Sequence, residues 1–479
     1  MYQIDLNSKI HVHFIGIGGI SMSGLAELLL SRGFTVSGSD GKASPLTDSL
    51  TEKGCIIAIG QKAENITDDI DLVVYTTAIH KDNPEFAEAV RRELPMLTRA
   101  ELLGQIMKNY PLSVAVSGTH GKTTTTSMLT AILLAAEVDP TISVGGMLRE
   151  IGGNIRIGRS GYFVTEACEY TNSFLSLFPK IGVILNIEED HLDFFEDLAD
   201  IRRSFQKFAE LLPEDGVLIL HSGIDQPDEI IKATQKGVSV LTFGLPDAGP
   251  ENAFPCYSCK DISFDSAGCA SYTLLEKNEE AGRIKLSVPG EHNITNSLAA
   301  IAAARALDID LDDIRKGLSE FTGTDRRFEL KGKAGGITII DDYAHHPTEI
   351  RATLRAANNY PHKRLWCVFQ PHTYSRTRAF FDDFADALLL ADRVVLADIY
   401  AARETDTLGM SSELLTRAIN NKVVSKPEES ETEPKAVYFD SFEKIEEFLK
   451  ENCGEGDLVL TMGAGNIVEV GEALLQLLS

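Results

Sequence analysis

The chain has 479 residues, of which 43% are hydrophobic and 24% charged, the balance of a globular protein with material for about three buried cores. Forty-five Lys and Arg against 71 Asp and Glu leave a net charge of −26, which disfavours binding to nucleic acid or to anionic membrane surfaces. No apolar run predicts a membrane span, and the first residues lack the pattern of a secretory signal. We therefore expect a cytoplasmic enzyme, without membrane insertion, that is a monomer or a homodimer.

Short β-branched apolar runs alternate with longer amphipathic stretches along most of the chain, which predicts an α/β fold with parallel sheets. In the first unit we expect strands at 11–17, 34–38 and 72–75 and a helix at 20–31. A second unit follows Pro111, with strands at 113–117, 162–166 and 181–187 and a helix at 122–136. Residues 253–288 show short alternating runs, typical of antiparallel strands at a sheet edge.

A third unit begins near residue 321, with strands at 336–341 and 364–370 on either side of a helix at 347–357. An acidic, proline-flanked stretch at 428–434 is expected to be a solvated loop. The cysteine cluster Cys256, Cys259 and Cys269 lacks a fourth ligand at regular spacing, so we expect ordinary thiols there rather than zinc. The pattern predicts three consecutive domains at 1–108, 109–321 and 322–479.

A glycine-rich loop joins the strand at 113–117 to the following helix, with the sequence Gly118-Thr119-His120-Gly121-Lys122-Thr123-Thr124. Glycines let backbone N–H groups converge on a phosphate, the lysine neutralises its charge, and a hydroxyl ligates Mg²⁺. Val116 occupies the first glycine position of the strict pattern, and an ordinary strand–turn–helix junction is the alternative. Because strand, Gly-Lys-Thr and helix coincide, we predict that this loop binds the phosphates of ATP.

A second glycine-rich loop, Gly16 to Gly19, also joins a strand to a helix, and Asp40 follows the next strand at the spacing of a ribose-binding acid. Ser21 occupies the third glycine position of the dinucleotide pattern, so a tight packing turn is the alternative. Two phosphate loops predict two phosphorylated ligands, ATP and a nucleotide-linked substrate. That pairing indicates an ATP-driven transferase or ligase.

Acidic and imidazole side chains follow two strands of the second unit, where the carboxyl ends of parallel strands converge. We predict a site for Mg²⁺ or Mn²⁺ formed by Thr123, Glu166 and His191. The alternative for the second cluster is a helix start capped by Asp190.

An alanine-rich helix opens with His292, Asn293 and Asn296, whose amides suit an adenine edge. Helix capping by Asn293 is the alternative. In the third unit, Arg326 and Arg327 lie in a predicted loop, and polar residues end two successive strands, at 341–347 and 370–376. This predicts another active-site edge for a polyphosphate or a carboxylate. The alternative for His345 and His346 is that they cap the helix that follows.

These motifs together resemble the Mur ligase family over essentially the whole chain. The resemblance rests on six segments in family order, at 13–19, 118–124, 186–193, 290–296, 341–347 and 369–376. It implies a Rossmann-like N-terminal domain that holds UDP, a central P-loop ATPase domain with a mostly parallel sheet, and a Rossmann-like C-terminal domain that admits the amino acid. It also implies a ligase that uses ATP to join L-alanine to the lactyl carboxylate of UDP-N-acetylmuramate through an acyl phosphate, releasing ADP and phosphate during peptidoglycan precursor synthesis.

The same resemblance implies roles for individual residues. The expected catalytic residues are Lys122, His191, His372 and Arg376, and the expected metal ligands are Thr123, Glu166 and His191. Nucleotide contacts are expected from residues 118–124 and from His292, Asn293, Asn296, Arg327 and Asp342. Substrate contacts are expected from Gly16, Gly18, Gly19, Ser39, Asp40, Tyr343 and His346.

This chain departs from the family pattern at Cys168, Tyr170 and Thr171, where many members read Asp, Ser and Asp, and at Thr373, where many members have Arg. Lys207 lies near the position of a modified lysine in several relatives, and we leave it out of the site. A ligase that adds a recovered peptide to the same sugar is the main alternative. An NAD-dependent oxidoreductase and a nucleotide sensor are more distant ones.

Overall fold

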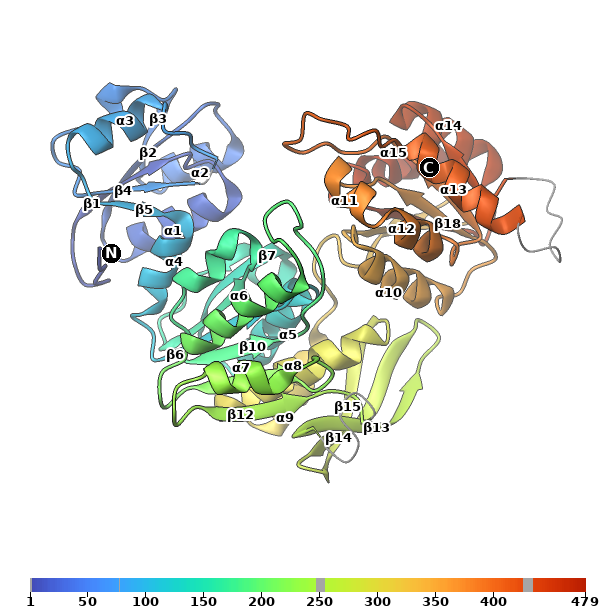
Figure 1. Cartoon of the computed structure of the whole chain (residues 1–479), viewed down its shortest axis with the longest axis horizontal. Helices are drawn as coiled ribbons and strands as arrows, with labels where there is room; N and C mark the ends of the chain where they lie inside the picture. Colours follow the sequence, from blue (N-terminus) through green and yellow to red (C-terminus); the bar gives the residue numbers. More distant parts are fainter. Residues whose placement is uncertain (1, 77, 247–254, 425–433) are drawn as a thin grey trace.

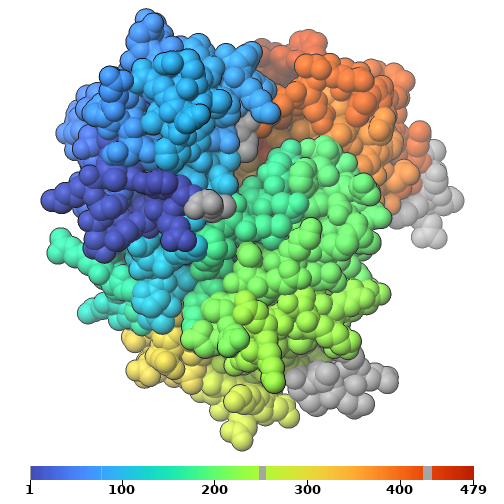
Figure 2. Space-filling model, turned by 60° about the vertical axis from the view of Figure 1, so that its left-hand side comes forward, coloured from blue at the N-terminus to red at the C-terminus, as the bar shows by residue number. Residues whose placement is uncertain are grey.

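The computed structural model describes residues 2–76, 78–246, 255–424 and 434–479, and its strands form three separate sheets (Figure 1). Strands and helices alternate in all three parts, so the predicted three-part α/β fold is confirmed. The first and third domains lie on the same side of the central domain, as Figures 1 and 2 show. The loop expected at 428–434 lies, apart from Pro434, outside the described residues.

The N-terminal domain contains a fully parallel sheet in the order β3-β2-β1-β4-β5. Strand β1 is buried on both faces, and it ends at Ile15 instead of residue 17 because Gly16, with φ +84°, turns the chain toward the first helix. The strands are β1 His11–Ile15, β2 Thr35–Asp40, β3 Ile56–Ile59, β4 Leu72–Tyr75 and β5 Met96–Thr98. The helices are α1 Ile20–Ser31, α2 Pro45–Glu52, α3 Pro84–Arg91 and α4 Arg99–Met107, with a short 3₁₀ helix η1 Ala63–Asn65.

The central domain contains a mostly parallel sheet in the order β15-β14-β13-β12-β11-β10-β6-β9-β7-β8. The antiparallel strands predicted within 253–288 are confirmed, because β13, β14 and β15 pair antiparallel at one edge. The first strands are β6 Leu112–Ser117, β7 Thr141–Leu148, β8 Gly153–Arg156, β9 Tyr162–Ala167 and β10 Ile181–Ile184. The others are β11 Val217–His221, β12 Ser239–Phe243, β13 Tyr257–Phe264, β14 Cys269–Glu276 and β15 Glu279–Pro289.

Helices cover both faces of the central sheet. Val114 and Val116 belong to a core with α5, α8 and α9, whereas Ala115 belongs to a core with Phe205 and Phe208 of α6, as the alternation of side chains along a strand requires. The helices are α5 Lys122–Ala135, α6 Leu198–Glu210, α7 Pro227–Ala233, α8 His292–Ala306 and α9 Leu311–Glu320, and the 3₁₀ helices are η2 Arg149–Ile151 and η3 Tyr170–Ser176. None of the described helices meets the length and hydropathy of a membrane span.

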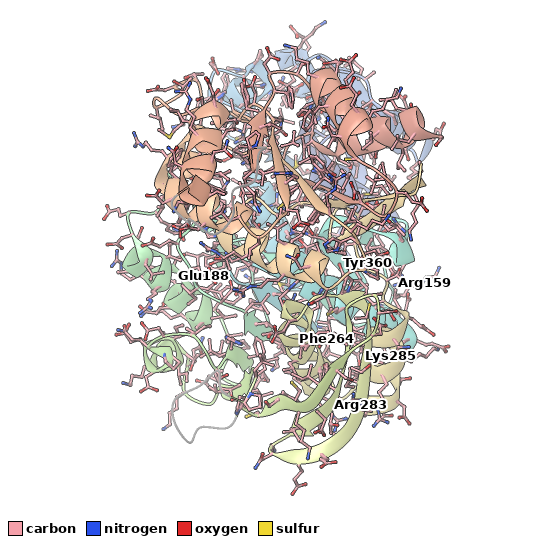
Figure 3. All side chains as sticks on the ribbon, turned by 90° about the vertical axis from the view of Figure 1, so that its right-hand side faces the viewer. Arg159, Glu188, Phe264, Arg283, Lys285 and Tyr360 are labelled. Atoms are coloured by element: carbon pink, nitrogen blue, oxygen red, sulfur yellow. The ribbon has the colours of Figure 1, made fainter. Side chains whose placement is uncertain are left out.

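The C-terminal domain contains a sheet in the order β16-β17-β21-β18-β19-β20, in which β16 is the antiparallel edge strand. Its strands are β16 Glu329–Ala334, β17 Ile337–Asp342, β18 Leu365–Phe369, β19 Arg393–Leu396, β20 Ala436–Tyr438 and β21 Leu458–Met462. Its helices are α10 Pro347–Asn358, α11 Tyr374–Ala379, α12 Phe381–Leu388, α13 Ser412–Val424, α14 Phe442–Asn452 and α15 Val468–Leu478. In Figure 3, α10 crosses above the central domain, with Glu188 and Tyr360 labelled near its two ends.

Candidate functional site

The loop between β6 and α5 is held in a conformation that requires glycine. Gly118 and Gly121 have φ values of +141° and +83°. A Cβ atom on Gly121 would lie 2.6 Å from Oδ1 of Asn296, and one on Gly118 would lie 2.9 Å from Cβ of Leu185. The loop therefore packs directly against α8 and the segment after β10, at the edge where β6, β9 and β10 end.

Lys122 is enclosed by oxygen atoms at this edge. Its Nζ donates to the carbonyl oxygens of Gly118, at 2.5 Å, and Thr119, at 3.0 Å, and lies 2.9 Å from a carboxylate oxygen of Glu169. Burial alone would lower the pKa of Lys122, but the charge of Glu169 raises it above its usual value. The ammonium is therefore charged at neutral pH and fixed beside the loop.

The segment after β10 clamps the loop backbone. Asn186 accepts from the backbone N–H of His120 at 2.8 Å and donates to its carbonyl at 3.0 Å. The Thr119 hydroxyl accepts from the backbone N–H of Glu188 at 2.9 Å. Because these groups bind the loop, β10 ends at Ile184 and not at the expected residue 187.

A cavity of about 310 Å³ adjoins the loop, between the central and C-terminal domains. Among its lining residues are the predicted nucleotide contacts His120, Gly121, Thr124, His292, Asn293, Asn296, Arg327 and Asp342. Asn293 donates to the carbonyl of Pro289 at 2.7 Å and accepts from Asn296 at 3.0 Å. Glu291, not Asn293, occupies the N-cap position of α8, so the capping alternative for Asn293 is wrong.

The C-terminal domain closes the far side of this cavity. Asp342 is buried at the end of β17, where its carboxylate accepts from the backbone N–H groups of Phe328 and Ala344, both at 2.8 Å. Burial raises its pKa to about 6. The Arg327 guanidinium lies 5.2 Å from the ring centre of Tyr343.

The predicted metal ligands divide into two groups. The carboxylate of Glu166 accepts from the backbone N–H of Gly145 at 2.5 Å, and burial raises its pKa, whereas the nearby Thr123 hydroxyl acts to lower it. His191 instead stacks on Tyr170, with ring centres 4.4 Å apart, and its Nε2 faces Glu169 at 4.0 Å and Asp190 at 3.7 Å. Asp190 caps no helix, because α6 begins at Leu198 with Asp197 as its cap. The helix-cap alternative for this cluster is therefore wrong.

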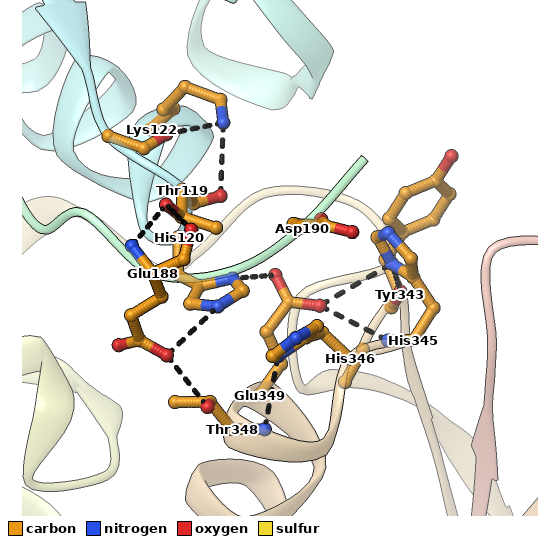
Figure 4. Close-up of polar contacts among 12 residues, drawn as sticks. Thr119, His120, Lys122, Glu188, Asp190, Tyr343, His345, His346, Thr348 and Glu349 are labelled. Carbon is orange, nitrogen blue, oxygen red and sulfur yellow. Dashed lines mark hydrogen bonds and ion pairs between the residues drawn. The ribbon is translucent and has the colours of Figure 1, made fainter. Parts of the chain in front are cut away.

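A polar contact joins the glycine-rich loop to α10 (Figure 4). His120 lies between Glu349, at 3.3 Å from Nδ1, and Glu188, at 3.5 Å from Nε2. The Glu188 carboxylate also accepts from the Thr348 hydroxyl at 2.8 Å. Burial would lower the pKa of His120, but the adjacent carboxylates of Glu188 and Glu349 raise it to about 9. His120 is thus a cation between two carboxylates of different domains.

His346 completes a group with His120 and Glu188 whose ligating atoms lie within 4.8 Å of one another. His346 caps α10, and its Nδ1 accepts from the backbone N–H of Thr348 at 3.3 Å. In the neutral ring the proton is then on Nε2, which leaves no lone pair there for a metal. We interpret the group as an interdomain contact, and the helix-cap alternative for His346 is confirmed. His345 instead directs Nδ1 at the carbonyl of Tyr343, at 3.0 Å.

The segment between β18 and α11 brings the last two predicted catalytic residues together. Arg376 donates to Nδ1 of His372 at 3.1 Å and, through its other nitrogens, to Asp190 of the central domain. The ring of His372 is stacked on Tyr400, with centres 5.6 Å apart. Burial lowers the pKa of His372 to about 4, so the imidazole is neutral.

The first glycine-rich loop lies on the N-terminal domain, apart from these residues. The backbone N–H of Gly18 donates to the Asp40 carboxylate at 2.9 Å, and a Cβ on Gly18 would lie 2.8 Å from the same oxygen. Gly19 is the N-cap of α1. Ser39 is fully buried and donates its hydroxyl to Glu85, so its side chain supports the loop from behind.

Among the polar residues that line or support the site but were not predicted are Glu169, Asn186, Glu188, Asp190 and Glu349. Each lies in the segment after a strand or in the first turn of a helix, but Glu169 and Glu349 fall outside the six motifs. Placement beside a predicted residue was therefore the available signal, but it does not specify the partner.

Family models match almost all of the chain. The model of the Mur ligase family catalytic domain matches residues 11–111, the Mur ligase middle domain matches 116–304, and the Mur ligase glutamate ligase domain matches 326–465. The UDP-N-acetylmuramate–L-alanine ligase of Lachnospira eligens is 59% identical over 99% of this chain and 100% of its own length. The enzyme of the same name from Agathobacter rectalis is 57% identical, with the same coverage.

Solved structures agree with this similarity. The UDP-N-acetylmuramate–alanine ligase of Thermotoga maritima superposes with a TM-score of 0.76 at 28% identity, over 98% of both chains. A murein peptide ligase of Psychrobacter arcticus gives a TM-score of 0.67 at 25% identity, also over 98% of both chains. The chain belongs to the Mur ligase family.

Proposed function

We propose that this protein is an ATP-dependent ligase that joins L-alanine to the lactyl carboxylate of UDP-N-acetylmuramate in the cytoplasm. The observation that supports this most directly is a glycine-rich loop that encloses the Lys122 ammonium and, through His120, Gly121 and Thr124, lines a 310 Å³ cavity whose walls come from two domains. Such a site binds a nucleotide and excludes water from its phosphates. Relatives that are 50–59% identical bear the name of this ligase, over nearly their whole length.

Each of the three domains binds a different ligand. We assign the UDP part of the substrate to residues 1–108, where Gly18 and Asp40 form the loop, and ATP to residues 109–321. The amino acid belongs to residues 322–479, through His372 and Arg376. Ligands on three domains meet only if the domains close on one centre, which is common in ligating enzymes.

ATP supplies the phosphoryl group that turns the lactyl carboxylate into an acyl phosphate with a good leaving group. The chain's own contribution is orientation and charge. The cationic Lys122 neutralises charge beside the loop, and the backbone clamp from Asn186 keeps the loop N–H groups fixed. Arg327, which lines the cavity, adds a second cation from the C-terminal domain.

The oxygen atoms of Thr123 and Glu166 suit Mg²⁺, since a hydroxyl at the start of α5 and a carboxylate at the end of the adjacent strand β9 come to the same edge of the sheet. We propose that these two residues hold the cation, with its charge balanced by the phosphates. His191, which lies in the second group with Glu169 and Asp190, would add a nitrogen donor suited to Mn²⁺.

The test is a phosphate-release assay with UDP-N-acetylmuramate, ATP and Mg²⁺. We expect release only when L-alanine is added, and much slower release when L-alanine is replaced by a cell-wall peptide. Phosphate release that does not depend on L-alanine would rule out the proposed function. A preference for the peptide would assign the chain to the peptide-adding branch of the family.

A further inference from the structure

A buried ion pair connects the central domain to the C-terminal domain, at a residue to which we have given no role so far. Both Nε and Nη2 of Arg376, in α11, donate to Oδ1 of Asp190, at 3.0 and 2.8 Å. Asp190 is 5% exposed and Arg376 is 9% exposed. In Figure 4, Asp190 lies between the loop residues of the central domain and Tyr343 and His345 of the C-terminal domain.

This ion pair determines the orientation of the guanidinium. Two of its nitrogens donate to one carboxylate oxygen, and the third, Nη1, donates to Nδ1 of His372 at 3.1 Å. An arginine has no acceptor, so Nδ1 of His372 must accept, and the proton of the neutral ring is on Nε2. The stacking of His372 on Tyr400 fixes the plane of that ring.

The backbone around Arg376 is fixed by other contacts, within the C-terminal domain. Thr373 N–H donates to the carbonyl of Tyr400 at 2.9 Å. Glu404 accepts from the backbone N–H groups of Tyr374, at 2.6 Å, and Ser375, at 3.1 Å. The backbone therefore does not need Asp190. The carboxylate acts on the direction of the guanidinium and, through it, on the protonated nitrogen of His372.

We propose that Asp190 is a positioning residue that prepares Arg376 and His372 to receive the carboxylate of the incoming amino acid. Because Asp190 comes from the central domain, the amino-acid subsite is complete only when the C-terminal domain is docked. This proposal rests on the proposed function and deepens it. It links amino-acid binding to domain closure by one buried, charge-assisted contact.

The test compares Asp190→Asn with the wild type in the phosphate-release assay, with each substrate varied in turn. Asn keeps the shape of the side chain but removes its charge. We expect the KM for L-alanine to rise at least tenfold, while the KM values for ATP and UDP-N-acetylmuramate stay within twofold. A role in folding alone would not separate the three substrates in this way.

Arg149→Gln is the matched control. Arg149 also connects the two domains, through Asp325 at 3.1 Å and Glu329 at 2.7 Å, but its side chain is 62% exposed. Screening by water makes such a pair weak. We expect this variant to leave all three KM values unchanged.

A double-mutant cycle with Arg376→Gln separates positioning from direct binding. If Asp190 acts through Arg376, the double variant has the same KM for L-alanine as Arg376→Gln alone. Additive effects would overturn the proposal. Asp190→Glu, which keeps the charge, provides the comparison if Asp190→Asn does not fold, and its KM for L-alanine should rise because the carboxylate is displaced.

The outcomes distinguish this proposal from the proposed function. A wild type without alanine-dependent phosphate release overturns the function and the subsite together. An active wild type with an unchanged KM for L-alanine in Asp190→Asn overturns the positioning role alone.

Discussion

The ammonium of Lys122 lies 2.9 Å from the carboxylate of Glu169, a residue that is 2% exposed and stands 47 positions later in the chain. The pair joins the start of α5 to the segment after β9, so the cation has a fixed place at the edge of the sheet. A buried carboxylate is costly unless a cation stays next to it. Lys122 therefore has both a structural role and the catalytic one that we propose.

Replacement of Lys122 by Ala should remove both roles. We expect kcat to fall by about 100- to 1,000-fold, the effect of losing a positioned charge in a transition state. Stability should fall by about 3 kcal/mol, because Glu169 is left buried without its partner. Urea titration of the double variant Lys122→Ala/Glu169→Gln should recover most of that stability without recovering turnover. Turnover near the wild-type rate in Lys122→Ala would contradict the assignment.

Replacement of Gly121 by Ala tests the packing of the loop on α8. The new methyl group would lie 2.6 Å from Oδ1 of Asn296, at a φ of +83° that costs an alanine about 1–2 kcal/mol. We expect the KM for ATP to rise at least tenfold, measured by phosphate release. Gly454→Ala is the control, because a Cβ there meets no atom within 4 Å and the backbone needs no glycine. Equal KM values for ATP in Gly121→Ala and Gly454→Ala would show that the contact between the loop and α8 does not affect ATP binding.

The loop of the N-terminal domain is tested by Gly18→Ala. A Cβ on Gly18 would lie 2.8 Å from Oδ2 of Asp40 and would disturb the 2.9 Å hydrogen bond between them. We expect a rise of about tenfold in the KM for UDP-N-acetylmuramate and none in the KM for ATP. Gly41→Ala, next to Asp40 but with open space around its Cβ position, should behave like the wild type. A rise in the KM for ATP alone, in Gly18→Ala, would mean that the UDP site lies elsewhere.

The pH dependence of the unfolding free energy should show how much the charged ring of His120 stabilises the fold. Its pKa of about 9 in the folded protein exceeds the ordinary 6.5, so the charged ring stabilises the fold fully below about pH 6.5. That stabilisation is lost as the pH rises through 9. The difference in unfolding free energy between wild type and His120→Gln should therefore shrink between pH 6.5 and 9.5.

His221 is the control for this measurement, because burial lowers its pKa. Its neutral form is the one the fold favours, so any contribution to stability is lost at low pH instead. His221→Gln should show the opposite trend, with the larger change below pH 6.5. If the difference in unfolding free energy between wild type and His120→Gln stays constant up to pH 10, His120 makes no charged contact with Glu188 and Glu349.

The local parts of the site could be predicted from the sequence, because they depend on neighbours in the chain. Glycines, Lys122 and Thr123 between a strand and a helix predicted the loop that encloses the Lys122 ammonium, and parallel strands bring Glu166 and the segment after β10 to the same edge. Short alternating runs likewise predicted the antiparallel strands β13 to β15.

The contacts between domains could not be predicted in this way. His120 and Glu349 are 229 positions apart, Asp190 and Arg376 are 186 apart, and Glu188 and Thr348 are 160 apart. Periodicity and motif spacing describe one element at a time and contain no information on which distant loops meet. The same limit explains Asp190, which the sequence allowed as a helix cap and the fold uses as a partner of Arg376.

Transfer of oxygen from the substrate to phosphate tests the central claim most directly. UDP-N-acetylmuramate labelled with heavy oxygen in its lactyl carboxylate would be turned over with ATP, Mg²⁺ and L-alanine, and the released phosphate analysed by mass spectrometry. If the carboxylate is activated as an acyl phosphate, each phosphate contains one labelled oxygen. Unlabelled phosphate, formed alongside the amide product, would contradict the account.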